Sequence, residues 1–193
     1  MTRGWKCTAL VLAVWAAPAA ELVAQDAQTT LQEGMAEILA VTDNLKSSQG
    51  VADKIEPILV RRICFESMTR RALGPGWRQL TTAQQKEATR LFTKLIIRSY
   101  SKKFTPGEKA EVKYLKPSSP APGKEEIPTT MLYKGGRYSI VYRMEDKGKW
   151  LVTDILVEGV SLVANYRAQF DDLFRKGGPS AVLNSLKESV SRT

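Results

Sequence analysis

Apolar residues change their spacing twice along this chain, near residue 110 and again near residue 160. Before residue 110 they recur every three or four positions, which is the period of an amphipathic helix. From there to residue 158 they alternate, which is the period of a strand, and after residue 160 the helical period returns. This order predicts one α+β domain in which helices pack around a curved antiparallel sheet.

The helical stretches are separated by turn and stop residues. Pro57 should bend or interrupt the second helix, because proline lacks the amide hydrogen of a helical turn. Thr81 or Thr82 is expected to cap the longest helix, and Ser161 the next one. The expected helices span residues 29–46, 51–62, 66–73, 82–103 and 161–176, and a last helix begins at Pro179 after Gly177-Gly178.

Four strands are expected, at residues 111–116, 127–134, 137–145 and 149–158. Gly135-Gly136 and Asp146-Lys147-Gly148 should form the two hairpin turns, because glycine supplies the positive φ that such turns need. The Pro-rich stretch 116–123 should be a loop, since proline is excluded from a sheet interior. The four strands should therefore form an antiparallel meander.

The last two expected strands are rich in apolar side chains. One face of the third strand carries Tyr138, Ile140, Tyr142 and Met144. On the last strand we expect one face to carry Trp150, Val152 and Leu156, and the other Leu151, Ile155 and Val157. Both of its faces should then be covered. These side chains form either a closed core or the wall of an apolar cavity, and periodicity does not distinguish the two.

The first twenty residues have the pattern of a cleavable signal peptide. Arg3 and Lys6 form a basic start, residues 8–16 are apolar, and residues 17–20 are the small residues of a cleavage site. The apolar stretch is too short to span a bilayer, which needs about 20 residues, although a retained anchor is the alternative. We expect residues 1–20 to be removed and residues 21–193 to form one exported domain.

The chain carries a net charge of +9 and contains no histidine. This composition excludes histidine-based triads and the commonest metal ligand, so we expect no metal, no cofactor and no enzymatic activity. The catalytic alternative is Asp154, which is expected on the same face of the last strand as Glu158, four positions later, and would be the base of an isomerase-like enzyme. The other interpretation is a structural, hydrogen-bonded Asp154. Export argues against a nucleic-acid partner and favours anionic lipid surfaces or acidic proteins.

The helix expected at residues 82–103 carries a basic residue at every fourth position of its outer face. Like charges at this spacing repel, by about 0.2–0.5 kcal/mol for each pair. The face is therefore either simply solvated or a ridge that docks an acidic partner or lipid head groups. We call it the basic ridge, and it consists of Lys86, Arg90, Lys94, Arg98 and Lys102.

Two long motifs indicate a family. Residues 65–100 contain F-x-x-M-x-R-R-x-L-G-x-x-W-R-x-x-T, followed by Q-x-x-x-x-x-x-L-F-x-x-L-I-I-R-S-Y. Residues 154–170 read D-I-L-V-E-G-V-S-L-V-A-N-Y-R-A-Q-F, shortly after G-K-W. The chain resembles the MlaC family, also called the toluene-tolerance auxiliary proteins, over nearly all of residues 21–193.

The resemblance implies a periplasmic phospholipid carrier in which a sheet of about four strands and the helices enclose an apolar lipid cavity. It implies transport between an outer-membrane lipoprotein–porin complex and an inner-membrane ABC transporter with an MCE-domain protein, and we expect a monomer. Arg98, Arg143 and Arg167 are expected at the head group or mouth, with ion pairing as their alternative role. The expected tail-facing residues are Tyr100, Met131, Ile140, Tyr142, Val152, Ile155, Val157, Val160, Leu162, Val163 and Tyr166.

Three other functions stay open at this point. The protein could carry another lipid, such as a hopanoid, or a hydrophobic solvent. It could be the isomerase-like enzyme that uses Asp154, or a scaffold of the cell envelope that holds no ligand.

Overall fold

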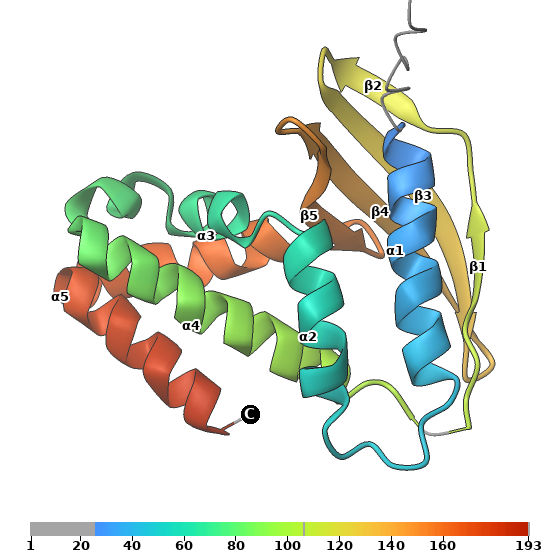
Figure 1. Cartoon of the computed structure of the whole chain (residues 1–193). Helices are drawn as coiled ribbons and strands as arrows, with labels where there is room; N and C mark the ends of the chain where they lie inside the picture. The colour runs from blue at the N-terminus through green and yellow to red at the C-terminus, as the bar shows by residue number, and fades with distance from the viewer. Residues whose placement is uncertain (1–25, 106, 193) are drawn as a thin grey trace, which may run out of the picture.

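The computed structural model describes residues 26–105 and 107–192, so the expected signal peptide lies outside the described residues. The described chain has the predicted α+β fold (Figure 1). Its helices are α1 (Ala27–Thr42), α2 (Val51–Arg62), α3 (Phe65–Leu73), the 3₁₀ helix η1 (Gly74–Gln79), α4 (Thr82–Ser101) and α5 (Leu162–Arg192). Its strands are β1 (Glu111–Tyr114), β2 (Ser118–Ala121), β3 (Lys124–Tyr133), β4 (Gly136–Asp146), β5 (Trp150–Val157) and β6 (Val160–Ser161). None of the described helices has the length and apolarity needed to cross a membrane.

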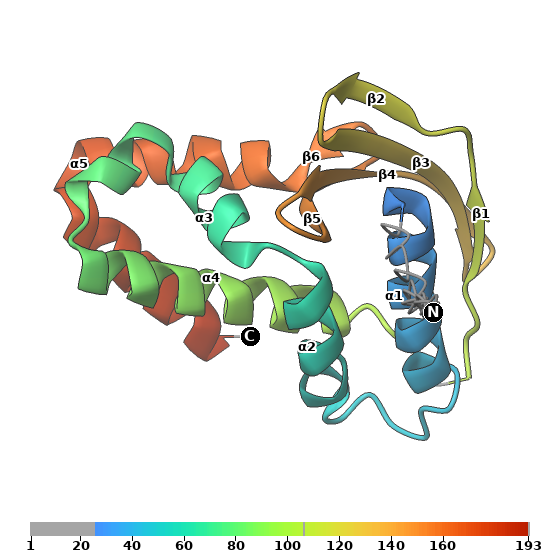
Figure 2. The same cartoon turned by 45° about the horizontal axis from the view of Figure 1, so that its top comes forward.

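The strands form one curved antiparallel sheet in the order β1-β3-β4-β5-β6, with β2 also paired to β3 (Figure 2). The expected four-stranded meander is present as β1, β3, β4 and β5. Two short strands were not predicted: β6, which leads into α5, and β2, which arises from the Pro-rich stretch expected to be a loop. β2 pairs with the same side of β3 as β1 does, so it is an edge strand, the position that proline tolerates.

Both hairpin turns lie one residue away from their predicted positions. Tyr133 pairs with Gly136, so the first turn consists of Lys134 and Gly135, with φ angles of 51° and 72°. Two successive positive φ angles are typical of a type I′ turn, which matches the twist of the flanking strands. In the second hairpin the connecting residues are 147–149, with Gly148 at a φ of 84°.

A β-bulge in β5 was missed by the sequence analysis. Met144 pairs with Val152 and Arg143 pairs with Asp154, which leaves Thr153 without an opposite residue. The extra residue shifts the alternation of side chains by one position. The predicted faces of this strand are therefore wrong: Trp150, Val152, Ile155 and Val157 share one face, and Leu151, Asp154 and Leu156 share the other.

The concave face of the sheet is covered by helices, and α1 lies within its curve (Figure 2). Opposite residues of antiparallel strands point to the same side, so the register assigns each side chain to a face. The apolar residues of the concave face, such as Ile127, Tyr142 and Met144, join one hydrophobic core with Leu31 and Met35 of α1. Among the described residues, the apolar side chains of the convex face stay outside this core.

The remaining helices pack together beyond the β5 edge of the sheet (Figure 1). As predicted, Thr81 caps α4, here in a reciprocal capping box, and Ser161 caps the start of α5. The break between the last two expected helices is also present, at Gly177 and Gly178 within α5. By contrast, α2 runs through Pro57 without the expected interruption.

Two glycines permit close contact between η1 and α5. A Cβ atom on Gly74, whose φ is 50°, would lie 2.1 Å from the guanidinium of Arg167. A Cβ atom on Gly76 would lie 2.2 Å from the ring of Phe174. A side chain at Gly74 would therefore displace the Arg167 guanidinium, and one at Gly76 would displace the Phe174 ring.

Replacing Gly74 by alanine should lower the free energy of unfolding by about 1–3 kcal/mol. The added methyl group meets a positive φ and the Arg167 guanidinium at once, and urea denaturation measures the loss. Gly50→Ala is the matched control, because Gly50 also has a positive φ, of 72°, but nothing lies within 4 Å of the added atom. Equal losses in the two variants would show that the Arg167 contact contributes nothing.

Candidate functional site

The concave face of the sheet is an apolar surface that the fold assembles from separate strands. Six of the eleven predicted tail-facing residues lie on it: Met131, Ile140, Tyr142, Val152, Ile155 and Val157. Five neighbours on the same face were not predicted as tail-facing, namely Val112, Tyr114, Ile127, Thr129 and Met144. Alternation within the strands expected at residues 111–116 and 127–134 was the signal that could have found four of them.

The concave face is closed at one end and open at the other. Ile127 and Met144, towards the closed end, are almost fully buried. At the opposite end Met131 and Val157 are half-buried, Tyr138 is 39% exposed and Val160 is 62% exposed. We call these four residues the open margin. Apolar side chains that remain accessible beside a buried apolar face can admit an apolar ligand.

The closed end is held by the carboxylate of Glu145, which is nearly buried. Arg71 of α3 donates a hydrogen bond to it, and the amino groups of Lys147 and Lys124 lie 3.1 Å and 3.7 Å away. Burial alone would raise the pKa of Glu145, but the hydrogen bonds from Arg71 and Lys147 outweigh it and hold the pKa below its usual range. The carboxylate therefore stays ionised and ties α3 to the β4–β5 hairpin.

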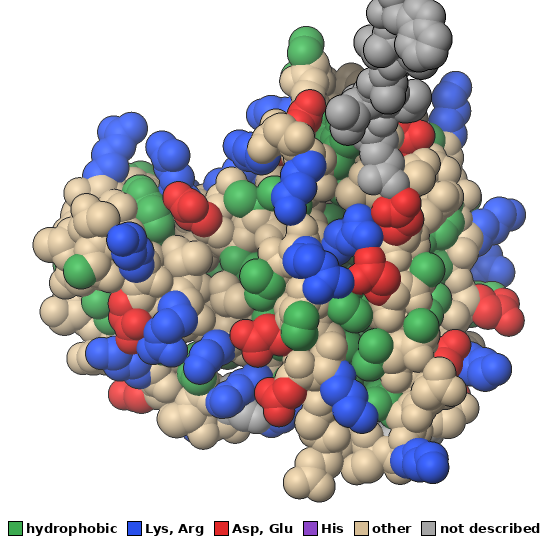
Figure 3. Space-filling model, in the orientation of Figure 1, with side chains coloured by type: hydrophobic (Ala, Val, Ile, Leu, Met, Phe, Trp, Pro, Cys, Tyr) green, Lys and Arg blue, Asp and Glu red, His purple; other side chains and the backbone are tan. Residues whose placement is uncertain are grey.

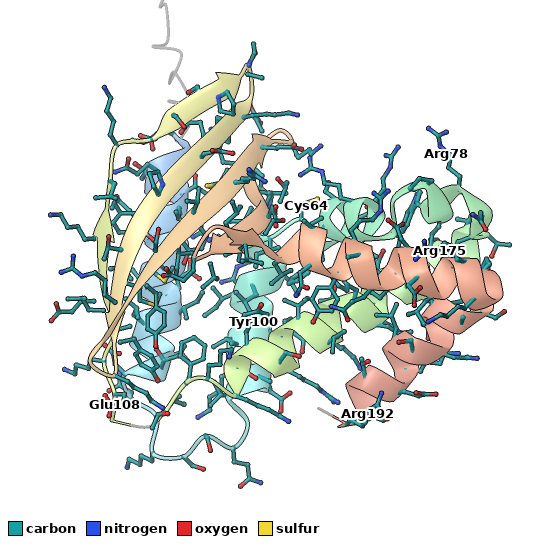
Figure 4. All side chains as sticks on the ribbon, turned by 180° about the vertical axis from the view of Figure 1, so that it is seen from behind. Cys64, Arg78, Tyr100, Glu108, Arg175 and Arg192 are labelled. Carbon is teal, nitrogen blue, oxygen red and sulfur yellow. The ribbon has the colours of Figure 1, made fainter. Side chains whose placement is uncertain are left out.

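Four of the tyrosines on or beside this face have a pKa above the usual value. Burial raises the pKa of the Tyr142 hydroxyl, and the neighbouring Tyr114 adds to the rise. On the helices, burial also raises the pKa of Tyr166, and the nearby Tyr100 contributes. Tyr100 is half-buried at the C-terminal end of α4, on the side that faces the sheet (Figure 4). All four phenols therefore stay neutral, as the wall of an apolar site requires.

The start of α5 carries the last predicted tail-facing residues. Leu162 and Val163 are buried in its first turn. Tyr166 packs against Phe92 of α4 and Phe170, with ring centroids 5.0 Å and 5.8 Å away. These side chains join α5 to α4 where the two helices leave the sheet.

Asp154 occupies the junction between the sheet and α5, on the convex side, and is only 4% exposed. Its carboxylate accepts hydrogen bonds from the Ser161 hydroxyl at 2.6 Å and from the amides of Ile155 and Val163 at 2.9 Å and 3.1 Å. The Arg143 guanidinium lies 3.3 Å away. Four donors satisfy this carboxylate, which favours the structural interpretation over the catalytic one.

Glu158 does not share a strand face with Asp154, contrary to the prediction. It follows β5 in a turn, at a φ of 50°, and its carboxylate accepts a hydrogen bond from the Ser139 amide at 2.5 Å. The two carboxylates therefore do not face a common space. Among the described residues, no group of three or more carboxylate or cysteine side chains is placed to hold a metal ion.

The three arginines predicted at the head group or mouth are not brought together. Arg143 lies on the convex face, where its Nε donates to Glu126 at 2.7 Å. Arg167 donates to Asp171 at 2.8 Å and lies against η1. Arg98 donates to the carbonyl of Val190 in α5 at 2.9 Å, and much of its side chain remains in solvent.

The basic ridge lies along the outer side of α4, where acidic side chains stand among the basic ones (Figure 3). Arg90 is held by Glu87 through two hydrogen bonds of 2.8 Å. Lys86, Lys94 and Lys102 form no close ion pair among the described residues, although the charge of Lys94 helps to lower the pKa of Glu87. The ridge therefore presents these three lysines as its unpaired charges.

The structure shows no apolar cavity among the described residues, so the cavity expected from the resemblance stays a prediction. One hollow, of about 330 Å³, lies between the start of α2 and the end of α4. Its lining is largely polar and consists of Ser48, Gly50, Val51, Ala52, Asp53, Arg98, Ser101 and Lys102. The apolar concave face shares the hydrophobic core with Leu31 and Met35 of α1.

A single apolar sheet face, covered by helices and open along one margin, defines an α+β protein of the kind that holds apolar ligands. The family model described as MlaC protein matches residues 29–188, so the chain belongs to the MlaC family. The family predicted from the two motifs is thereby confirmed.

A solved structure with a TM-score of 0.80 is the phospholipid-binding protein from Ralstonia solanacearum in complex with a phospholipid. The two chains are 26% identical, and the match covers 87% of this chain and 98% of the other. No curated protein matches the sequence. The family and this neighbour together point to a lipid-binding carrier and not to an enzyme.

Asp154→Ala should lower the free energy of unfolding by about 3 kcal/mol or more, because it leaves buried donors and Arg143 without their acceptor. Thermal or urea denaturation measures the loss. Asp171→Ala is the control, since it removes an ion pair that is largely in solvent and should cost less than about 1 kcal/mol. If the two substitutions cost the same, Asp154 does not hold the junction.

Proposed function

We propose that this protein is a periplasmic phospholipid shuttle, exported with a signal peptide at residues 1–20. It carries lipid between the outer and inner membranes for an ABC transporter of the Mla type. The observation that carries the proposal is the apolar concave face with its open margin. The structural neighbour that was solved with a bound phospholipid supports the same assignment.

The acyl tails lie along the concave face, between the sheet and α1. Because Leu31 and Met35 of α1 pack in the same core as this face, the tails enter at the open margin by separating α1 from the sheet. Each buried methylene group contributes about 0.8 kcal/mol, so two long tails offset the loss of several side-chain contacts. The wall consists of the predicted tail-facing residues together with Val112, Tyr114, Ile127, Thr129 and Met144.

We place the head group near Arg98 rather than near the other two predicted arginines. Arg98 and Lys102 line the polar hollow together with the hydroxyl-bearing Ser48 and Ser101. Guanidinium, ammonium and hydroxyl donors match the oxygens of a phosphate. Arg143 is committed to two carboxylates on the opposite face of the sheet, which supports this choice.

The protein exchanges lipid as a monomer with two partners, an inner-membrane MCE-domain protein and an outer-membrane lipoprotein–porin complex. The basic ridge is the surface we propose for docking. Its unpaired lysines attract an acidic partner over a distance of about 10 Å at moderate ionic strength.

Native mass spectrometry of the purified mature protein, followed by lipid extraction, tests the carriage of phospholipid. A co-purifying diacyl phospholipid is the expected result. A hopanoid or a solvent molecule in its place would favour the other-lipid alternative. A protein that stays empty after incubation with phospholipid vesicles would leave the scaffold alternative standing.

Tyr138→Glu should lower the fraction of lipid-bound protein about tenfold, because it puts a charge on the open margin where an apolar tail must pass. Native mass spectrometry after loading from detergent-dispersed phospholipid gives the fraction. The control is Leu115→Glu on the convex side, since Leu115 and Tyr138 are 42% and 39% exposed. Equal occupancy in the two variants would contradict the proposed entry site.

The basic ridge has its own test. Lys86→Glu combined with Lys94→Glu should slow lipid transfer between partner-bearing membranes about tenfold, while the protein keeps its lipid. A reconstituted transfer assay measures the rate at low and high salt. Lys46→Glu with Lys54→Glu changes the net charge equally at exposed positions outside α4. Unchanged transfer in the ridge variant would show that the ridge is only a solvated face.

A further inference from the structure

The β3–β4 hairpin extends past the end of its neighbour β5. The last pair between β4 and β5 is Ile140 with Val157, whereas β3 and β4 stay paired as far as Tyr133 and Gly136. The turn lies at the end of the sheet away from α3 (Figure 1). On the β5 side of β4, residues 136–139 are therefore a projecting tip.

Two large apolar side chains are exposed on the two faces of this tip. Leu132 is 41% exposed on the convex face, and Tyr138 is 39% exposed on the concave face. The Tyr138 ring leans back over Gly136, since a Cβ atom there would lie 2.9 Å from the phenol oxygen. The ring therefore lies towards the turn. Aliphatic tips and tyrosine rings are the side chains that settle at the interface of a bilayer.

The charges of the tip are all positive. Residues 131–138 read Met-Leu-Tyr-Lys-Gly-Gly-Arg-Tyr, with two cations and no carboxylate. Lys134 and Arg137 are exposed, and neither has a carboxylate partner among the described residues. Lys134 lies over the Tyr133 ring, 5.6 Å from its centroid.

Some of the acidic side chains around the tip are hydrogen-bonded or lie next to a basic residue. Glu158 is hydrogen-bonded to the Ser139 amide, and Glu111 stands opposite Leu132 on β1. Glu108 lies in the same region (Figure 4), next in sequence to Lys109. The turn itself is thus the most basic part of this end of the sheet.

The hairpin is also firmly held. The Tyr133 hydroxyl donates to the carbonyl of Lys103 at 3.1 Å and accepts from the amide of Thr105 at 2.8 Å. The tip is therefore tied to the loop that follows α4. A preorganised tip loses little conformational entropy when it meets a surface.

We infer that the tip of the β3–β4 hairpin docks on an anionic phospholipid bilayer. Leu132 and the Tyr138 ring enter the interface, and Lys134 and Arg137 meet the phosphates. The inference rests on the proposed function in one respect, because a phospholipid carrier meets its partners at the surface of a bilayer. The docked tip brings the open margin, which includes Tyr138, against the lipid surface.

Vesicle co-sedimentation of the mature protein tests this contact, with vesicles of phosphatidylethanolamine and phosphatidylglycerol against vesicles of phosphatidylcholine alone. Binding should favour the anionic vesicles and weaken as salt is raised. Lys134→Glu with Arg137→Glu should lower the binding constant at least about fivefold for each reversed cation. Leu132→Ser should weaken binding without changing its dependence on salt.

Matched control substitutions outside the tip show whether the effect on vesicle binding is specific to the tip. Lys46→Glu with Lys54→Glu changes the net charge equally, and Val60→Ser removes an apolar side chain that is 52% exposed on α2. The inference is overturned if the wild-type protein does not bind anionic vesicles or binds neutral vesicles equally well. It is also overturned if the control substitutions weaken vesicle binding as much as the substitutions in the tip. Binding only to a partner protein, and to no vesicle, would also overturn it.

The lipid occupancy of the same samples separates this inference from the proposed function. An empty wild-type protein that still binds anionic vesicles through the tip would contradict carriage and support docking. A wild-type protein that carries phospholipid but does not bind anionic vesicles would support carriage and contradict docking.

Discussion

The buried carboxylate of Asp154 joins the two halves of the molecule. Its oxygens accept hydrogen bonds from the end of β5, from the Ser161 cap and from the first turn of α5, so the direction of α5 is set at the sheet. The aromatic contacts of Tyr166 with Phe92 then position α4 relative to α5. A neutral side chain at residue 154 could not satisfy these donors and the Arg143 guanidinium together, which is why one charged group can be buried here.

The β-bulge at Thr153 is what allows both the junction and the apolar face to exist on one strand. Without it, strict alternation would place Asp154 on the same face as Val152, inside the core. The extra residue turns Asp154 to the convex side and keeps Ile155 and Val157 in line with Tyr142 and Ile140. A single additional residue thus separates the polar junction of β5 from its apolar face.

Most helices and the strand meander follow from local patterns in the sequence, such as the Thr81 cap and the alternation from residue 111 onward. The bulge does not, because nothing near Thr153 distinguishes an extra residue from a regular one. The type I′ turn lies at Lys134 and Gly135 because cross-strand register places it there, whereas composition favoured the glycine pair. Whether a predicted site residue can contact a ligand depends on hydrogen-bond partners that are distant in the chain, such as the Val190 carbonyl for Arg98. The spacing of residues in the sequence does not reveal such partners.

The Glu145 cluster makes the two ends of the sheet unequal. One end is cross-linked by a carboxylate that Arg71 and two lysines share, whereas the other end is a projecting hairpin with half-exposed apolar side chains. Among the described residues, ion pairs therefore fix α3 to the sheet at the Glu145 end, and no ion pair of this kind links a helix to the hairpin end. If α1 and the sheet separate to admit a lipid tail, the cross-linked end therefore resists that separation more than the hairpin end does.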